Sequence, residues 1–185
     1  MAEEVDNNDA ELLEQFRNES TRNYAFHLIV TKYQKRLYWQ ARRIVIDHDD
    51  ANDVIQNVFI KVWKNLANFK EASRLYTWLY RIAVNESLTF LKQKRAPLFI
   101  PFEKVEYSLS RKLTDDNYFK GEEVEKLLQQ AILTLPEKQR IVFNMKYFDE
   151  LKYEEMSEVL GTSVGALKAS YHHAVKKIEE FLKKN

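Results

Sequence analysis

The sequence predicts an all-α protein made of two small helical domains. Only three glycines occur, at positions 121, 161 and 165, so the first 120 residues contain none. The alternating pattern of a half-buried strand is hard to find, whereas apolar residues recur at helical spacing over long stretches. This periodicity fails over one proline-containing segment in the middle of the chain. A helical domain is therefore expected on each side of a flexible linker.

Three helices are expected to enclose the core of the first domain. The strongest signal follows Ala51, where apolar residues recur on one helical face: Val54, Ile55, Val58, Phe59, Val62, Trp63 and Leu66. An aromatic-rich helix is predicted before it, from Tyr24 to Ile46. Another is predicted after it, from Leu75 to Lys94.

The linker is expected over residues 96–121, which contain two of the three prolines and no sustained apolar stripe. Helices resume at Gly121, and Pro136 opens a further helix where a missing amide proton costs nothing. The expected organisation is an acidic segment 1–20, a first domain 21–95, the linker, and a second domain 122–185. The acidic segment is either a frayed tail or a short packing helix.

Composition narrows the function classes. The 185 residues include no cysteine, which excludes disulfides, thiolate metal sites and cysteine nucleophiles. No secretory signal or membrane-length apolar run is found, so a cytoplasmic protein without membrane insertion is expected. No nucleophile–base pair, metal-ligand cluster or phosphate-binding glycine loop emerges. The sequence therefore predicts no enzyme activity, no metal and no cofactor.

The charges are segregated although the formal net charge is only +1. Acidic residues dominate the segment 1–20, whereas residues 74–95 and the chain after Gly161 are basic. Two separate basic elements suggest a polyanion that is contacted at two places. Two solvated helix faces are the alternative interpretation.

The C-terminal segment has the layout of a helix-turn-helix. A short helix from Tyr153 to Leu160 is followed by Gly161, which suits a left-handed turn, and by Ser163, which suits the cap of a second helix. The small core is expected to contain Met156, Leu160 and Leu167. The outer side of the second helix is expected to present Lys168, Ser170, Tyr171, His172 and Lys176. Lysines suit DNA phosphates, and serine and histidine can contact base edges. The alternative to DNA binding is an ordinary helical hairpin with a solvated lysine face.

A second candidate surface lies on the helix from Leu75 to Lys94. Its apolar face is interrupted only by Glu86, and a helical wheel places Arg74, Thr77, Arg81, Asn85 and Lys92 opposite. Trp78 lies at one boundary of this basic face. A basic helix edged with aromatic rings suits partly single-stranded nucleic acid. Trp78 also fits a simpler role, in which it completes the core and exposes one edge.

Three segments together resemble the alternative sigma factors of the extracytoplasmic-function group: DDANDVIQNVFIKVWKNLANF, TWLYRIAVNESLTFL and LPEKQRIVFNMKYFDELKYEEMSEVLGTSVGALKASYHHAVKKI. The match covers roughly residues 20–95 and 122–183. The resemblance implies that the first domain docks on bacterial core RNA polymerase and opens the promoter near the minus-ten element. It implies that the second domain reads the minus-thirty-five element as duplex DNA.

The resemblance also implies roles for particular residues. The residues that match the polymerase-docking helix are Asp50, Asp53, Gln56 and Phe59, although acids near a helix N-terminus are also favourable for the helix itself. The loop from Phe69 to Arg74 matches the place where the family captures an extruded base. Many members carry arginines where this chain has Ser170 and His173, and a threonine where it has Ala166. The target sequence therefore stays open.

The sequence thus predicts a promoter-specificity subunit without catalytic chemistry. Its expected partners are core RNA polymerase and promoter DNA, as duplex and as melted strand. The family resemblance adds an anti-sigma factor, although no residue identifies one. Two alternatives remain: a helix-turn-helix regulator that does not replace the polymerase sigma subunit, and a helical adaptor that binds only protein.

Overall fold

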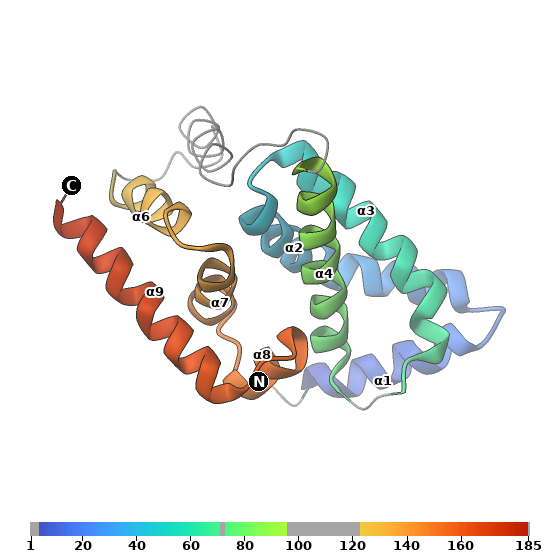
Figure 1. Cartoon of the computed structure of the whole chain (residues 1–185). Coiled ribbons are helices and arrows are strands. Elements are labelled where there is room, and N and C mark those ends of the chain that lie inside the picture. Colours follow the sequence, from blue (N-terminus) through green and yellow to red (C-terminus); the bar gives the residue numbers. More distant parts are fainter. Residues whose placement is uncertain (1–3, 71–72, 96–122, 185) are drawn as a thin grey trace. The chain divides into compact units, whose positions relative to one another are not determined.

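The structure is a computed structural model that describes residues 4–70, 73–95 and 123–184, and these residues contain helices and no strand. The chain divides into two compact units, Met1–Phe90 and Leu91–Asn185 (Figure 1). The predicted all-α fold class is confirmed. The predicted linker over 96–121 lies outside the described residues.

The first unit is built from four α-helices and one short 3-10 helix. These are α1 (Glu4–Arg17), α2 (Arg22–Val45), α3 (His48–Asn65), η1 (Leu66–Asn68) and α4 (Leu75–Arg95), the last of which extends beyond Phe90. Helix α2 packs against both α1 and α3. The three helices predicted from apolar spacing begin and end within a few residues of α2, α3 and α4.

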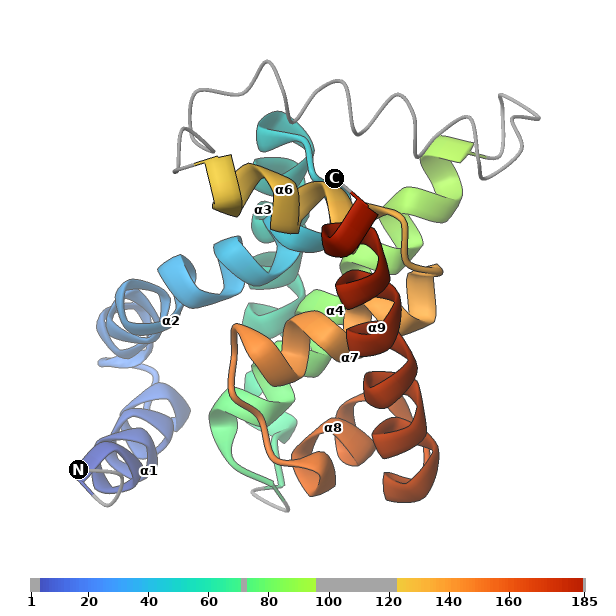
Figure 2. The same ribbon diagram turned by 90° about the vertical axis from the view of Figure 1, so that its left-hand side faces the viewer.

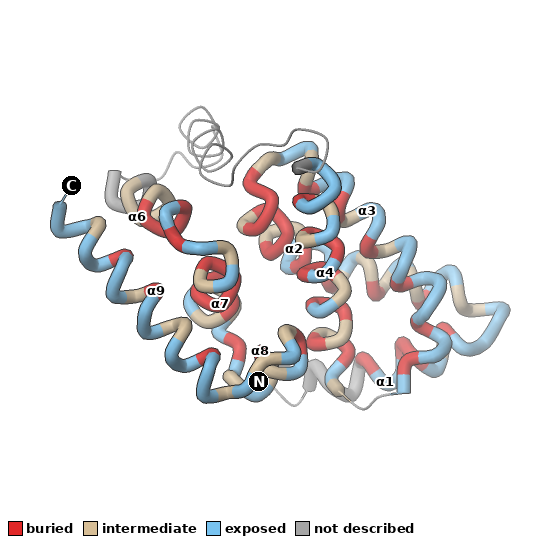
Figure 3. Tube along the Cα trace, viewed as in Figure 1, coloured by how far each residue is buried: buried red, intermediate tan, exposed pale blue. Residues whose placement is uncertain are grey.

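The core of the first unit follows the helical period. Val54, Val58 and Val62 on α3 are fully buried, and Figure 3 shows buried and exposed residues alternating along this helix. Trp63 departs from the prediction of a buried residue because it is 38% exposed. Its ring nevertheless packs edge-on against Phe16 and Phe26, with centroid distances of 5.4 and 4.9 Å.

The acidic N-terminal segment forms a packing helix. Leu12, Leu13 and Phe16 of α1 are buried, as is Asp9. The Tyr33 hydroxyl lies 2.7 and 2.6 Å from the two oxygens of the Asp9 carboxylate, which share its one proton, and the carboxylate also forms an ion pair with Lys32. A buried carboxylate requires such partners. These contacts therefore fix α1 to α2.

The connection between α2 and α3 is short and closely capped. Helix α2 is followed by its C-cap Ile46, whose φ of 69° is unusual for a β-branched residue. Asp47 then accepts hydrogen bonds from the amides of Asp49 and Asp50, at 3.0 and 3.2 Å. This N-cap satisfies amides that have no partner within the helix.

The second unit contains α6 (Glu123–Leu133), α7 (Glu137–Tyr147), α8 (Tyr153–Leu160) and α9 (Val164–Lys184). Its core is formed mainly by α6, α7 and α9 through Ala131, Ile132, Leu135, Phe143, Ala174 and Ile178. Both α7 and α8 lie against α9, as Figure 2 shows. Pro136 stands at the N-cap of α7, so the helix begins one residue later than predicted.

Helices α8 and α9 form the predicted helix-turn-helix. Gly161 ends α8 with a φ of 62°, and its amide donates to the Ser157 carbonyl at 2.9 Å. The Ser163 hydroxyl accepts a hydrogen bond from the Ala166 amide at 3.3 Å, so it caps α9 as predicted. Met156 and Leu167 are buried as expected. Leu160 is only half-buried, and Val159 is buried instead.

Candidate nucleic-acid interfaces

Helix α4 exposes a strip of basic and polar side chains. Arg74, Arg81, Asn85 and Lys92 are all exposed, and their spacing places them on one side of the helix. Trp78 lies at the edge of this strip and is half-buried. The strip has the positive charge and the bordering aromatic ring that a melted nucleic-acid strand requires.

Thr77 does not belong to this strip. It is 5% exposed, so the prediction that it lies on the exposed face is wrong. Thr77 shares a helical register with Tyr80 and Val84, and both of these residues are buried. The buried side of α4 is therefore wider than the apolar residues alone indicate.

Glu86, the residue that interrupts the apolar face of α4, has a specific partner. Its carboxylate forms an ion pair with the Lys61 ammonium on α3. Glu86 is 9% exposed, whereas Lys61 is exposed. A nearly buried carboxylate without an opposite charge would be strongly unfavourable. The pair connects α3 to α4 beside a pocket.

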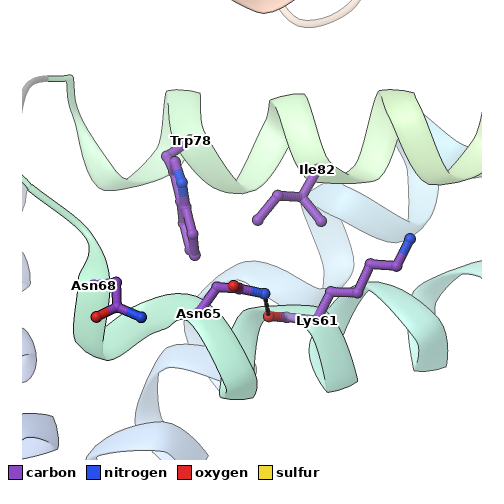
Figure 4. Close-up of a pocket in the computed structure, with 5 residues that line it drawn as sticks. All are labelled: Lys61, Asn65, Asn68, Trp78 and Ile82. Atoms are coloured by element: carbon purple, nitrogen blue, oxygen red, sulfur yellow. Dashed lines mark hydrogen bonds between the residues drawn. The ribbon is translucent and has the colours of Figure 1, made fainter.

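This pocket lies between the two helices and has a volume of about 340 Å³, which is within the range of small-molecule sites. It is lined by Lys61, Asn65, Asn68, Trp78 and Ile82. Figure 4 shows Trp78 and Ile82 extending from α4 toward the three residues of α3 and η1. The indole ring can stack on a flat aromatic ligand, and the two carboxamides can bind its polar edge.

Two contacts order the pocket walls. The Trp78 ring lies 5.1 Å from the ring of Phe69, which is buried. The Asn65 NH₂ group donates to the Lys61 carbonyl at 2.8 Å. Only the NH₂ group of a carboxamide can face a carbonyl oxygen. The Asn65 amide oxygen is therefore turned away from that bond, and Figure 4 shows it on the side of Trp78.

The second candidate surface is α9. Lys168, His172 and Lys176 are exposed, and Ser170 is half-buried. Ser163 is exposed at the start of the helix, where its hydroxyl also serves as the cap. This helix follows the turn of the helix-turn-helix, which is the position of a recognition helix.

Tyr171 does not lie on the outer side of α9, so that prediction is wrong. Its half-buried ring packs against the core of the second unit and lies parallel to Phe143, with centroids 5.8 Å apart. Burial raises the pKa of Tyr171, and the nearby phenols of Tyr153 and Tyr147 raise it further. Helical register explains why Tyr171 faces the core: it lies four residues after the buried Leu167 and three before the buried Ala174.

Helix α3 presents a different kind of surface. Asp53 and Gln56 are exposed and Asp50 is half-buried. Phe59 is also half-buried, with its ring edge-on to Phe26 at 6.4 Å. The same side of the helix continues with two large apolar side chains, Ile60 and Trp63, which are 52% and 38% exposed. Neighbouring large apolar side chains that are exposed are typical of a protein-binding surface.

Comparisons with known proteins identify the family. The family models for sigma-70 region 2 and sigma-70 region 4 match residues 29–96 and 125–178. The chain is 31% identical over 182 residues to the RNA polymerase sigma-H factor of Pseudomonas aeruginosa, covering 94% of this chain and 93% of the relative. It is 31% identical over 163 residues to the ECF RNA polymerase sigma-E factor of Escherichia coli, covering 84% and 85%. The chain belongs to the ECF sigma factors.

Solved structures share the fold of this ECF sigma factor. CnrH, solved in complex with the cytosolic domain of CnrY, has a TM-score of 0.70 at 23% identity, covering 96% of this chain and 99% of that chain. The sigma factor RpoE of Bartonella quintana, solved with the anti-sigma factor NepR, has a TM-score of 0.66 at 20% identity, covering 85% and 96%. None of the described helices has the length and apolar content needed to cross a membrane.

Sequence reasoning missed part of the candidate surfaces of this sigma factor. Lys61, Asn65 and Asn68 line the pocket, yet polar residues at the end of an amphipathic helix usually indicate only a solvated side. Ile60 is also not among the residues of α3 that the sequence predicts to be exposed. Its position seven residues after Asp53 places it on the same side of α3 as Asp53, and this spacing is the signal that could have found it.

Proposed function

We propose that this sigma factor is the promoter-recognition and promoter-melting subunit of a bacterial RNA polymerase. Residues 21–95 would form the docking and melting domain, and residues 122–185 would form the duplex-reading domain. The sigma factor itself would carry out no catalytic step. Opening of the promoter is driven instead by preferential binding of the open form.

The pocket beside the basic strip of α4 is the observation that carries the melting role. A base leaves the duplex at a cost of a few kcal/mol, and stacking on an aromatic side chain returns about 1–3 kcal/mol. Trp78 offers such a ring, and Arg74 and Arg81 are exposed on the same helix to bind phosphates. We assign the pocket to one extruded base of the melted strand, with Asn85 beside it on the strip.

Docking and duplex reading are assigned to the other two surfaces. Asp50, Asp53, Gln56 and Phe59 on α3 would bind basic and apolar groups of the polymerase, and Ile60 and Trp63 extend this surface. Lys168 and Lys176 on α9 would bind duplex phosphates, with Ser163, Ser170 and His172 near the base edges.

The solved relatives CnrH and RpoE were captured with CnrY and with the anti-sigma factor NepR. We infer that an anti-sigma protein controls this chain as well.

The decisive experiment is transcription by core RNA polymerase on a pool of promoter fragments, with and without this protein. We expect the protein to co-purify with the core enzyme and to select a subset of start sites. Asp53→Ala should weaken co-purification and leave promoter choice by the remaining complex unchanged. Salt-sensitive duplex binding without polymerase binding would instead support a conventional helix-turn-helix regulator. Absence of both would support a protein-only adaptor.

A further inference from the structure

Tyr153, the first residue of α8, has a lysine from each neighbouring helix over its ring. The Lys146 ammonium, from the last turn of α7, lies 5.2 Å from the ring centroid. The Lys168 ammonium, from α9, lies 5.6 Å from the same centroid. Both distances are within the range of cation–π attraction. One aromatic ring therefore connects the helix before the helix-turn-helix with its second helix.

Lys146 has a structural role. It is half-buried, and its ammonium donates a hydrogen bond to the Leu151 carbonyl at 3.1 Å. The connection it spans includes Glu150, whose φ of 53° is left-handed. The Lys152 amide then donates to the Glu155 carboxylate at 2.8 Å, which closes the first turn of α8. These contacts fix the backbone that carries Tyr153.

The phenol of Tyr153 lies close enough to Tyr171 to raise its pKa. Burial is the main cause of the raised pKa of Tyr171, and the phenols of Tyr153 and Tyr147 add to it. Tyr171 in turn stacks on Phe143, a buried residue of the core. The Tyr153 ring is therefore placed by the backbone that carries it, with the Lys146 and Lys168 ammonium groups over it.

Lys168 differs from Lys146 because it is exposed and lies on the candidate recognition helix. A lysine side chain has a long flexible stem and loses rotamer freedom when it binds. A contact that restricts the stem in advance reduces that loss and favours binding. We propose that Tyr153 is a positioning residue that holds Lys168 ready for the phosphate backbone. This inference rests on the proposed duplex-reading role of α9.

The test measures binding of the full chain, assembled with core polymerase, to a fluorescent duplex of a promoter selected in the transcription experiment. Tyr153→Leu should weaken binding by about two- to fivefold, the size of an exposed cation–π contact. Tyr153→Phe keeps the ring and should bind within about twofold of the natural protein. In a Lys168→Met background, Tyr153→Leu should cause no further loss, because the lysine it positions is gone.

Each contrary result has a defined meaning. An equal loss from Tyr153→Leu in both backgrounds would show a general structural role and overturn the proposal. An equal loss from Tyr153→Phe and Tyr153→Leu would assign the effect to the hydroxyl and also overturn it. If Lys168→Met binds as tightly as the natural protein, the proposed phosphate contact itself fails. If Lys168→Met weakens binding and Tyr153→Leu does not, only the positioning role fails.

A second measurement does not depend on DNA or on the stability of a variant. Protons on the carbon next to the Lys168 ammonium should show an upfield ring-current shift in the NMR spectrum of the natural protein. Tyr153→Phe should keep this shift. An unshifted signal in the natural protein would show that ring and lysine do not associate in solution, and the proposal would be withdrawn.

Discussion

Lys61 on α3 and Glu86 on α4 form an ion pair that joins the two helices at the edge of the pocket. Glu86 is nearly buried, whereas the Lys61 side chain keeps 54% of its surface in solvent. The attraction is therefore partly screened. The pair also holds the Lys61 stem along the pocket wall.

Glu86→Gln should lower the free energy of unfolding of the first unit by about 1 kcal/mol, the upper end for a partly exposed pair. All three tryptophans, Trp39, Trp63 and Trp78, belong to this unit, so urea unfolding followed by tryptophan fluorescence reports on it alone. A double-mutant cycle with Lys61→Met isolates the coupling energy. A coupling energy of zero would contradict the ion pair.

Tyr33→Phe should loosen α1. The substitution removes the hydroxyl whose proton is shared by the two oxygens of the buried Asp9 carboxylate and should cost about 1–2 kcal/mol. Faster amide hydrogen exchange in α1, with α4 unchanged, is the expected signature. Tyr24→Phe is the matched control because Tyr24 is 63% exposed, and it should leave the exchange of α1 unaltered.

The two glycines near the turn should respond to alanine in opposite directions. Gly161 has a φ of +62°, so Gly161→Ala should destabilise the second unit by about 1–2 kcal/mol. Gly165 lies within α9, and a Cβ there meets no atom within 4 Å among the described residues. Gly165→Ala should therefore stabilise the unit by about 0.5–1 kcal/mol. Thermal unfolding by circular dichroism compares the pair directly; equal shifts would refute the assigned turn geometry.

The pocket should prefer a base that carries an exocyclic amino group. The Asn65 amide oxygen is a hydrogen-bond acceptor and suits the exocyclic amino group of adenine, cytosine or guanine, whereas thymine has no amino group and offers only its ring N3–H as a donor. Asn65→Leu removes the acceptor at similar volume and should reduce the preference by about two- to tenfold, the value of one hydrogen bond. Binding of the polymerase complex to forked promoter fragments with each base at the extruded position measures this. A thymine preference in the natural protein would contradict it.

Lys168→Ala should weaken duplex binding across many sequences and reduce the salt slope of the binding constant by about 1. Lys184→Ala is the matched control, because it removes the same charge at the far end of α9. We expect a much smaller effect from it. If the two variants lose affinity equally, the lysines act only through net charge, and the assignment of a recognition surface to Lys168 fails.

Local signals explain which parts of this fold were predictable. The helix Tyr153–Leu160 was predicted with its observed ends because Gly161 and Ser163 act on their immediate neighbours. The errors at Thr77 and Tyr171 concern residues at the boundary of a helical face, where the tertiary neighbours decide which side is buried. The pocket was not predictable, because it depends on Asn65 and Trp78 approaching each other from different helices.

The length of the short 3-10 helix η1 offers one way in which promoter choice could diverge between related sigma factors. Residues three apart in a 3-10 helix lie above one another, and η1 spans the positions between Asn65 and Asn68. Inserting or deleting a single residue here would rotate Asn68 by about 120° relative to Asn65. If the pocket binds the extruded base as proposed, variation in the length of this segment would be enough to change which base fits, without any substitution of a pocket residue.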